Sequence, residues 1–226
     1  MRCVRTLCSL AGAGVLTVGL TAFPTAAQAQ TPVLCSESSL VDAIATANAA
    51  GGDTLLLLPF CTYRLTSAHG RGPAGPVGLP PITSPITLLG MGSTITRDPS
   101  APAFRVMEVE GAANVPSTKG QLSMVGVTVS GGSAVPPYPG GGISNLGGTV
   151  SLVSSGVTGN TAVAGAGIYT DNGSVSLTTS SVSGNTATTR GGGIYVNSGG
   201  VNLLASTVGG NTPDNCAPSG SVPGCT

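Results

Sequence analysis

The chain has 226 residues, of which only 7% are charged, and its 8 basic and 8 acidic side chains cancel. Without Arg2 and Arg5, which belong to a predicted leader segment, the acidic residues slightly outnumber the basic ones, so no positive surface for nucleic acid or anionic membrane is expected. Trp is absent and Gly reaches 36 residues, which excludes a core of large aromatic rings. Disordered chains contain few β-branched residues, and this chain has many, so we expect it to be folded. Because a core of large rings is excluded, the folded structure is expected to be repetitive.

Residues 1–29 have the pattern of a secretory signal. Two arginines begin it, the apolar run Leu10–Phe23 follows, and Ala27-Gln28-Ala29 is a small-residue cleavage site. That run is short and rich in Gly and Ala, and no later segment approaches the roughly 20 apolar residues of a membrane span. We therefore expect a secreted, extracellular protein with a single domain over residues 30–226.

Four cysteines remain after the signal, an even number in a chain bound for an oxidising compartment. Three pairings are possible, and position favours the two that close a local loop at each end of the chain. A metal site is the competing interpretation, but there is no CxxC spacing and the only histidine is His69, so no metal or other cofactor is expected. The favoured pairs are Cys35 with Cys61 and Cys216 with Cys225.

At the front, residues 38–50 place apolar side chains on one face of a helix that Ser38 or Ser39 would cap and Gly51-Gly52 would end. Strands are then expected at residues 53–58, 62–66, 85–96 and 104–109. The apolar helical positions are Leu40, Ile44 and Ala47.

The second half of the chain aligns with itself in three blocks whose leading isoleucines are 25 and 26 residues apart. In each block apolar residues alternate with Ser, Thr or Asn, which is the period of a strand with one buried face. A residue would then lie above its equivalent in the previous block, and each burial would contribute about 1.5–3 kcal/mol. The expected interior columns are Ile143, Ile168 and Ile194; Val150, Val175 and Val201; and Leu152, Leu177 and Leu203.

Each block turns at a Gly-Asn pair, with the asparagines at 160, 185 and 211. Asn tolerates the left-handed conformation, and stacked side-chain amides can bond from one block to the next. The alternative is a set of unrelated turn or glycosylation sites, because Asn160-Thr161-Ala162 and Asn185-Thr186-Ala187 match the glycosylation spacing. Their regular recurrence favours a structural ladder.

The stacked strands predict a parallel coil. Residues 30–60 would cap its first turn, and the Pro- and Cys-rich tail, residues 213–226, would close its last turn. Two insertions, residues 68–81 and 133–139, would project from the wall of the coil. They would either contain a recognition site or be insertions that the fold merely tolerates.

The recurring Gly-Gly-Ile and Asn-Thr-Ala elements, with Gly-Gly-Asp-Thr after the helix, resemble secreted bacterial β-helix repeat proteins of the pectate-lyase-like superfamily. They are also similar to polymorphic outer-membrane protein repeats, although Val stands where those repeats often have Phe. The resemblance implies an all-β fold, a right-handed single-stranded parallel β-helix with a short N-terminal capping helix. The resemblance indicates the fold much more strongly than it indicates any particular reaction.

Candidate chemistry is sparse. Glu108 and Glu110 are two apart and hence on one strand face, roughly 7 Å from each other, which overlaps the spacing in inverting glycosidases. The favoured alternative is a solvated face opposite inward Met107 and Val109. His69 lies in a Gly/Pro loop and is expected to be merely solvated. No catalytic residue is assigned.

Tyr169 and Tyr195 occupy equivalent outward positions in consecutive blocks. They would form a platform for a sugar ring, with Tyr138 as a third contact, or else a simple aromatic ladder. We therefore expect a non-enzymatic scaffold or adhesin-like protein that contacts polysaccharide or a surface protein. The alternative is a carbohydrate-active enzyme, a polysaccharide lyase or glycoside hydrolase. Ice binding is disfavoured because the outward positions do not form regular Thr columns.

Overall fold

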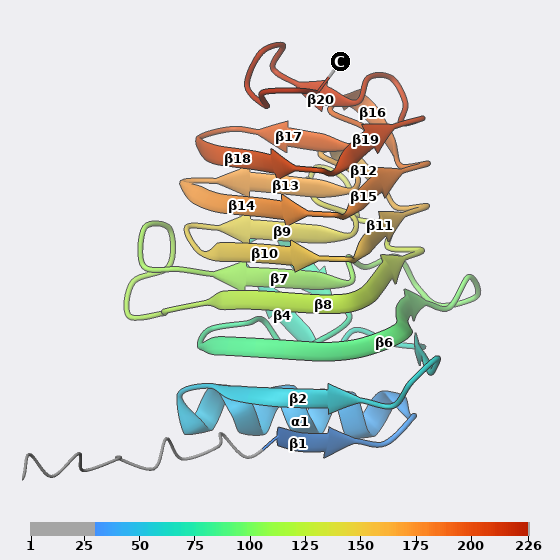
Figure 1. Cartoon of the computed structure of the whole chain (residues 1–226), viewed down its shortest axis with the longest axis vertical. Helices are drawn as coiled ribbons and strands as arrows, with labels where there is room; N and C mark the ends of the chain where they lie inside the picture. The colour runs from blue at the N-terminus through green and yellow to red at the C-terminus, as the bar shows by residue number, and fades with distance from the viewer. Residues whose placement is uncertain (1–29, 226) are drawn as a thin grey trace, which may run out of the picture.

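The computed structural model describes residues 30–225 (Figure 1), so the predicted signal lies outside the described residues. Over residues 30–225 the fold is β-rich, with mostly parallel sheets and one helix, α1 (Glu37–Ala50). The long sheet has the strand order β1 (Gln30–Val33), β2 (Asp53–Leu57), β6 (Pro85–Arg97), β8 (Gln121–Ser130), β10 (Thr149–Val153), β14 (Gly173–Thr178) and β18 (Gly199–Leu204), extended sideways by β3 (Thr62–Leu65), β11 (Gly156–Thr158), β15 (Ser181–Ser183) and β19 (Thr207–Gly209).

A second, five-stranded sheet runs in the order β20 (Cys216–Ala217), β17 (Ile194–Val196), β13 (Ile168–Asp171), β9 (Ile143–Leu146) and β7 (Met107–Glu110). Strands β12 (Thr161–Ala164) and β16 (Thr186–Arg190) form a parallel pair, whereas β4 (Gly70–Gly72) and β5 (Gly75–Val77) form an antiparallel hairpin. From residue 143 on, each repeat supplies two strands to the long sheet and one to the five-stranded sheet, and the repeats lie one above another (Figure 1).

The predicted register is confirmed. Leu152 pairs with Leu177, and Leu177 with Leu203, in parallel strands. The valine and isoleucine columns pair in the same way. Leu152 and Leu177 are fully buried in the core, while Leu203, in the last repeat, is partly buried against it. Side chains from successive repeats therefore share one dry interior that no single repeat could form.

The asparagines at the Gly-Asn turns form the predicted ladder. Asn160 Nδ2 donates to Asn185 Oδ1 at 2.9 Å, and Asn185 Nδ2 donates to Asn211 Oδ1 at 3.0 Å. Because Asn160 and Asn185 are 0% exposed, they are not glycosylation sites in the folded protein. The left-handed residue of each turn is the preceding glycine, such as Gly159 with φ 64°, and not the asparagine. The explanation of Asn by its backbone tolerance was therefore wrong, and its side-chain bonds account for its recurrence.

A second ladder, of serines, was not predicted. The Ser155 amide donates to Ser180 Oγ at 3.1 Å, and the Ser180 amide donates to Ser206 Oγ at 3.0 Å. The residues before these serines adopt positive φ, with Thr179 at 47°. A serine recurring at the repeat period was the sequence signal that could have revealed this ladder.

Helix α1 closes the N-terminal end of the core, as predicted, with Leu40, Ile44 and Ala47 buried. Its N-cap is Ser36, which accepts from the Ser39 amide at 3.2 Å, so the prediction of Ser38 or Ser39 was wrong. Gly51 ends the helix at φ 83°. The predicted Cys35–Cys61 disulfide is present and attaches the start of α1 to the residue before β3.

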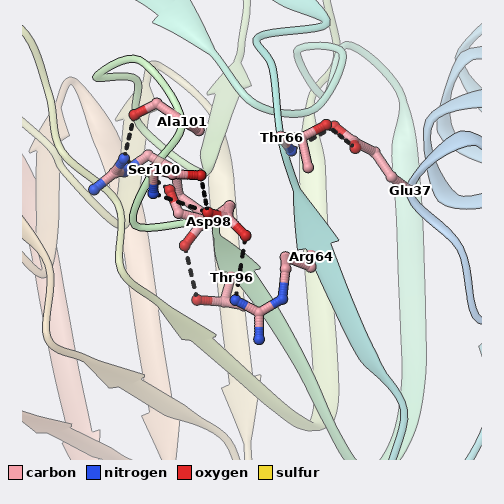
Figure 2. A network of polar contacts seen from close by, with 8 residues as sticks. Glu37, Arg64, Thr66, Thr96, Asp98, Ser100 and Ala101 are labelled. Carbon is pink, nitrogen blue, oxygen red and sulfur yellow. Dashed lines mark hydrogen bonds and ion pairs between the residues drawn. The ribbon is translucent and has the colours of Figure 1, made fainter.

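The carboxylate of Glu37 joins α1 to the chain after β3 (Figure 2). It accepts from the Thr66 amide at 2.8 Å and from the Thr66 hydroxyl at 2.6 Å. His69 Nε2 lies 2.7 Å from the same carboxylate, so the expectation of a merely solvated histidine was wrong. Burial alone would raise the pKa of Glu37, but the hydrogen bonds from Thr66, His69 and Ser67 hold that pKa below its ordinary value.

Figure 2 also shows Asp98 beside Arg64 and Ser100. Asp98 Oδ1 accepts from the Ser100 hydroxyl at 2.6 Å, and Asp98 Oδ2 lies 3.4 Å from Arg64. The bonds from Ser100 hold the pKa of Asp98 below its ordinary value. The Arg64 side chain is 54% exposed, so this ion pair contributes little to stability.

At the other end, the predicted Cys216–Cys225 disulfide closes the tail. β20 extends the five-stranded sheet, and Val222 is buried in the core. As far as residue 225, the tail adds no strand to the long sheet, so the expectation that it closes the last repeat holds for the five-stranded sheet only. Two disulfides indicate folding in an oxidising environment. Within residues 30–225 there is no helix of the length and hydropathy that a membrane crossing needs.

Candidate functional site

The outward face of the five-stranded sheet brings the predicted carboxyl pair and the predicted tyrosines together. Its register places Glu108, Ser144, Tyr169 and Tyr195 side by side in one column. Side chains alternate along a strand, so the isoleucine and methionine column beside them points inward and this column points outward. Glu108 lies outside the regular period of 25 to 26 residues, and its column was therefore not predicted.

The two glutamates are buried, so the prediction of a solvated face was wrong. Glu108 is 0% exposed and Glu110 is 7% exposed. The reason is the hairpin β4–β5, which folds back over β7. Gly72 lies so close that a Cβ there would overlap the Glu108 carboxylate and lie 2.8 Å from Glu110 Oε1. Only glycine fits between the hairpin and the acid pair.

Arg105 holds both insertions against this face. Its side chain is buried, with Nε 3.3 Å from Glu108 Oε2. One guanidinium nitrogen donates to the carbonyl of Pro139 at 2.7 Å, and the other donates to the carbonyl of Ala74. The two insertions predicted to project from the wall are therefore anchored, in part, on the five-stranded sheet by one side chain.

Unsatisfied polar atoms concentrate here. Among the described residues, the buried side-chain nitrogen and oxygen atoms without a well-aligned hydrogen bond are Arg105 Nε, both carboxylate oxygens of Glu108, and Ser144 Oγ. Arg105 Nε and Glu108 Oε2 are nevertheless joined as an ion pair. Ser144 is the neighbour of Glu108 in the outward column. Most buried polar groups in folded proteins are hydrogen-bonded, and clusters of exceptions mark candidate functional sites.

Burial sets the ionisation of the cluster. It raises the pKa of Glu108 to about 7; the nearby Arg105 opposes this effect and the charge of Glu110 adds to it. Burial also raises the pKa of Glu110. Burial lowers the pKa of Arg105 to about 10, against the attraction of Glu108. Glu108 therefore exchanges a proton near neutral pH.

The raised pKa of Glu108 predicts that stability falls as the pH rises. The folded state holds the proton up to about pH 7, whereas the unfolded chain releases it near the ordinary pKa of 4.5. The free energy of unfolding should therefore decrease between these values, with a limiting slope of about 1.4 kcal/mol per pH unit. The lowered pKa values of Glu37, Asp98 and Asp171 have the opposite effect on stability. These three carboxylates stabilise the folded protein at neutral pH, and that stabilisation is lost as the pH falls below their ordinary pKa values.

Urea unfolding followed by circular dichroism across this pH range measures the slope. We expect the wild type to be most stable in mild acid and Glu108→Gln to show a shallower decline toward neutral pH, of which the raised pKa of Glu110 gives the remainder. An unchanged slope in Glu108→Gln would contradict the assignment.

A surface pocket of ≈ 300 Å³ is lined by residues of both insertions and of the five-stranded sheet. Its Leu146 pairs with Glu110, and its Tyr169 lies in the column of Glu108. Asp171 on its wall accepts from Asn114 at 2.9 Å and from Ser198 at 2.6 Å. Burial opposes these bonds, yet they hold the pKa of Asp171 below its ordinary value, so the pocket has a carboxylate at neutral pH. The pocket is lined by Ala74, Asn114, Tyr138, Pro139, Tyr169 and Asp171, among others.

The three predicted tyrosines are divided between two roles. Tyr138 and Tyr169 line the pocket together. Tyr195 stacks on Tyr169, with ring centroids 5.8 Å apart and planes 9° apart, and Arg190 lies 5.2 Å from the centroid of Tyr195. Tyr169 and Tyr195 thus stack on each other as an aromatic ladder. Burial raises the pKa of Tyr169 to about 12. Sugar binding by these rings stays a prediction.

Within residues 30–225, no three His, Cys, Asp or Glu side chains lie close enough to hold a metal ion. Comparison of the chain with known protein families, with curated proteins and with solved structures finds no match in any of the three, so the function has to be inferred from the site itself.

Proposed function

We propose that this protein is a secreted, non-enzymatic, adhesin-like scaffold that binds polysaccharide in the pocket on its five-stranded sheet. The observation that carries the proposal is the pocket lining, in which two tyrosines lie with a carboxylate and an amide. Aromatic rings pack against the apolar faces of sugar rings, and carboxylate and amide groups bond their hydroxyls. The two disulfides support a location outside the reducing cytoplasm.

For the backbone, we propose a right-handed parallel β-helix like those of secreted bacterial repeat proteins of the pectate-lyase-like superfamily. In support, equivalent residues of successive repeats pair in parallel strands, and each repeat visits the two sheets in the same order. Such a coil grows by adding repeats without changing its width. It therefore suits an elongated ligand that spans several repeats.

One observation favours a second function, that of a carbohydrate-active enzyme. A carboxyl group that holds a proton near neutral pH is what a general acid needs, and Glu108 has that property beside a second carboxyl group. The hairpin covers both carboxyl groups, so a substrate could reach them only after the hairpin moved. We therefore rank binding first.

Binding of cell-wall and plant polysaccharides to the purified protein, measured by calorimetry, tests the proposal. We expect Tyr169→Ala and Tyr138→Ala each to weaken binding by about tenfold, because each removes one ring from the pocket. Phe60→Ala is the matched control, since Phe60 is 83% exposed and does not line the pocket. Full affinity in both tyrosine variants would contradict the pocket assignment.

The same polysaccharides, incubated with the wild type and with Glu108→Gln, separate the remaining hypotheses. Release of sugar products by the wild type, lost in Glu108→Gln, would establish the enzyme instead of the scaffold. Binding of a surface protein but of no polysaccharide would replace the proposed ligand class.

A further inference from the structure

The pocket that both insertions line contains one charged side chain, the carboxylate of Asp171. Its other lining residues are apolar, aromatic or amide-bearing, and none of them is Arg, Lys or His. Asp171 belongs to none of the ion pairs that the structure contains within residues 30–225. The negative charge of the pocket is therefore not balanced by an ion pair.

Neutral groups hold the Asp171 carboxylate in place. Its Oδ1 accepts from the Ser198 hydroxyl at 2.6 Å and from the Asn197 side chain at 2.9 Å, and its Oδ2 accepts from Asn114 at 2.9 Å. Because these three donors are uncharged, they fix the position of the carboxylate without cancelling its charge. A carboxylate has about four acceptor positions. Within residues 30–225 three of them are occupied, so one remains for a ligand.

Two tyrosine rings line the pocket with this carboxylate. Burial is the main cause of the raised pKa of Tyr169, and the charge of Asp171 adds to it, so the ring and the carboxylate lie within electrostatic reach of each other. The Tyr138 ring lies against Gly75 of β5, where a Cβ would be 2.7 Å from it, so the hairpin fixes the position of this ring. The faces of aromatic rings attract cations. Both rings therefore add to the attraction of Asp171 for a cation.

Two arginines lie near the pocket, but neither lines it. The Arg105 side chain is 1% exposed, and its guanidinium donates to backbone carbonyls of the two insertions and pairs with Glu108. Arg190 lies over the ring of Tyr195, on which Tyr169 stacks. A ligand in the pocket thus meets one carboxylate and two ring faces, and no basic side chain.

We propose that the pocket binds an amino-sugar polysaccharide, such as a glucosamine polymer, with a protonated amine at Asp171 and the sugar ring against Tyr138 and Tyr169. This inference rests on the proposed function and names the class of polysaccharide. An ammonium group has three donors, and one of them would make a charge-assisted hydrogen bond to the acceptor position that remains on Asp171. Neutral sugars lack that charge, and the carboxylate of a uronic acid would be repelled by Asp171.

Calorimetry of the purified wild type at about pH 6, where the amine and Asp171 are both charged, tests the inference. The probes are three oligosaccharides of equal length, made of glucosamine, of N-acetylglucosamine and of galacturonic acid. We expect the glucosamine oligosaccharide to bind at least about tenfold more tightly than its acetylated form, because acetylation removes the charge. The galacturonic acid oligosaccharide should bind more weakly still, and the preference should shrink in high salt.

Asp171→Asn should bring the affinities for the glucosamine oligosaccharide and its acetylated form within about twofold of each other. Asp98→Asn is the matched control, because hydroxyl and amide donors also hold the Asp98 carboxylate, and Asp98 does not line the pocket. We expect this control to keep the wild-type preference. Circular dichroism establishes that both variants are folded, and the comparison of ligands on the wild type stands whether or not Asp171→Asn folds.

The outcomes separate this inference from the proposed function. Equal affinity of the wild type for the two glucosamine forms, or tightest binding of the galacturonic acid oligosaccharide, would overturn the amino-sugar inference and leave polysaccharide binding in place. An undiminished preference in folded Asp171→Asn would do the same. Binding of no polysaccharide would overturn both, as would binding of a polylysine peptide alone, because the ammonium group would then belong to a protein partner.

Discussion

We expect Asn185→Ala to lower the free energy of unfolding by about 3–5 kcal/mol. Asn185 is 0% exposed. Its Oδ1 accepts from the backbone amide of Asn160 at 3.0 Å and from the Asn160 side chain at 2.9 Å, and its Nδ2 donates to the Val157 carbonyl at 3.0 Å. Alanine would leave these partners buried without bonds, each at a cost of about 1–3 kcal/mol.

Urea unfolding followed by circular dichroism measures this loss. The matched control is Asn202→Ala, because Asn202 is an exposed asparagine on β18 and its side chain makes no hydrogen bond among the described residues. We expect the control to change stability by no more than about 0.5 kcal/mol. Equal stability of the two variants would contradict the role of the asparagine ladder in holding successive repeats together.

We expect Arg105→Met to lower the free energy of unfolding by about 3–5 kcal/mol near pH 8, and by less near pH 5. Removing the guanidinium leaves Glu108 as a buried charge without its partner, and the protein must then unfold or take up a proton. In mild acid Glu108 already holds a proton, since its pKa is about 7 in the wild type. The loss that persists there reports the bonds from Arg105 to the two insertions.

The double variant Arg105→Met with Glu108→Gln separates these two contributions. It removes both charges, so we expect it to regain the pH-dependent part of the loss and keep the rest. Arg64→Met is the matched control, because the exposed pair with Asp98 is worth at most about 1 kcal/mol. The loss of stability could instead be equal at both pH values and remain in the double variant. That result would show that Arg105 acts only by holding the two insertions.

The candidate site was predictable only in part. The equivalence of Tyr169 and Tyr195 follows from the repeat, because each lies after an inward isoleucine of its block. The burial of Glu108 and Glu110 does not follow from it, because the hairpin that covers them lies more than thirty residues earlier in the chain. For the same reason His69 was expected to be solvated, although it contacts Glu37 across a similar separation. Pairing of Arg105 with Glu108 and with both insertions likewise had no sequence signal.

From the sequence alone came the strand period, the inward columns such as Leu152 with Leu177, the asparagine ladder and the two disulfide pairs. These features are repetitive or local, so a residue's neighbours one repeat away can be inferred from its own block. Only the tertiary structure decided which outward columns are covered and which edge of the long sheet stays open. Insertions and tails have no period, and where they settle depends on contacts with distant residues. That is why the acid pair is buried under residues 70–77 and why, within residues 30–225, no strand pairs with the side of β18 that faces away from β14.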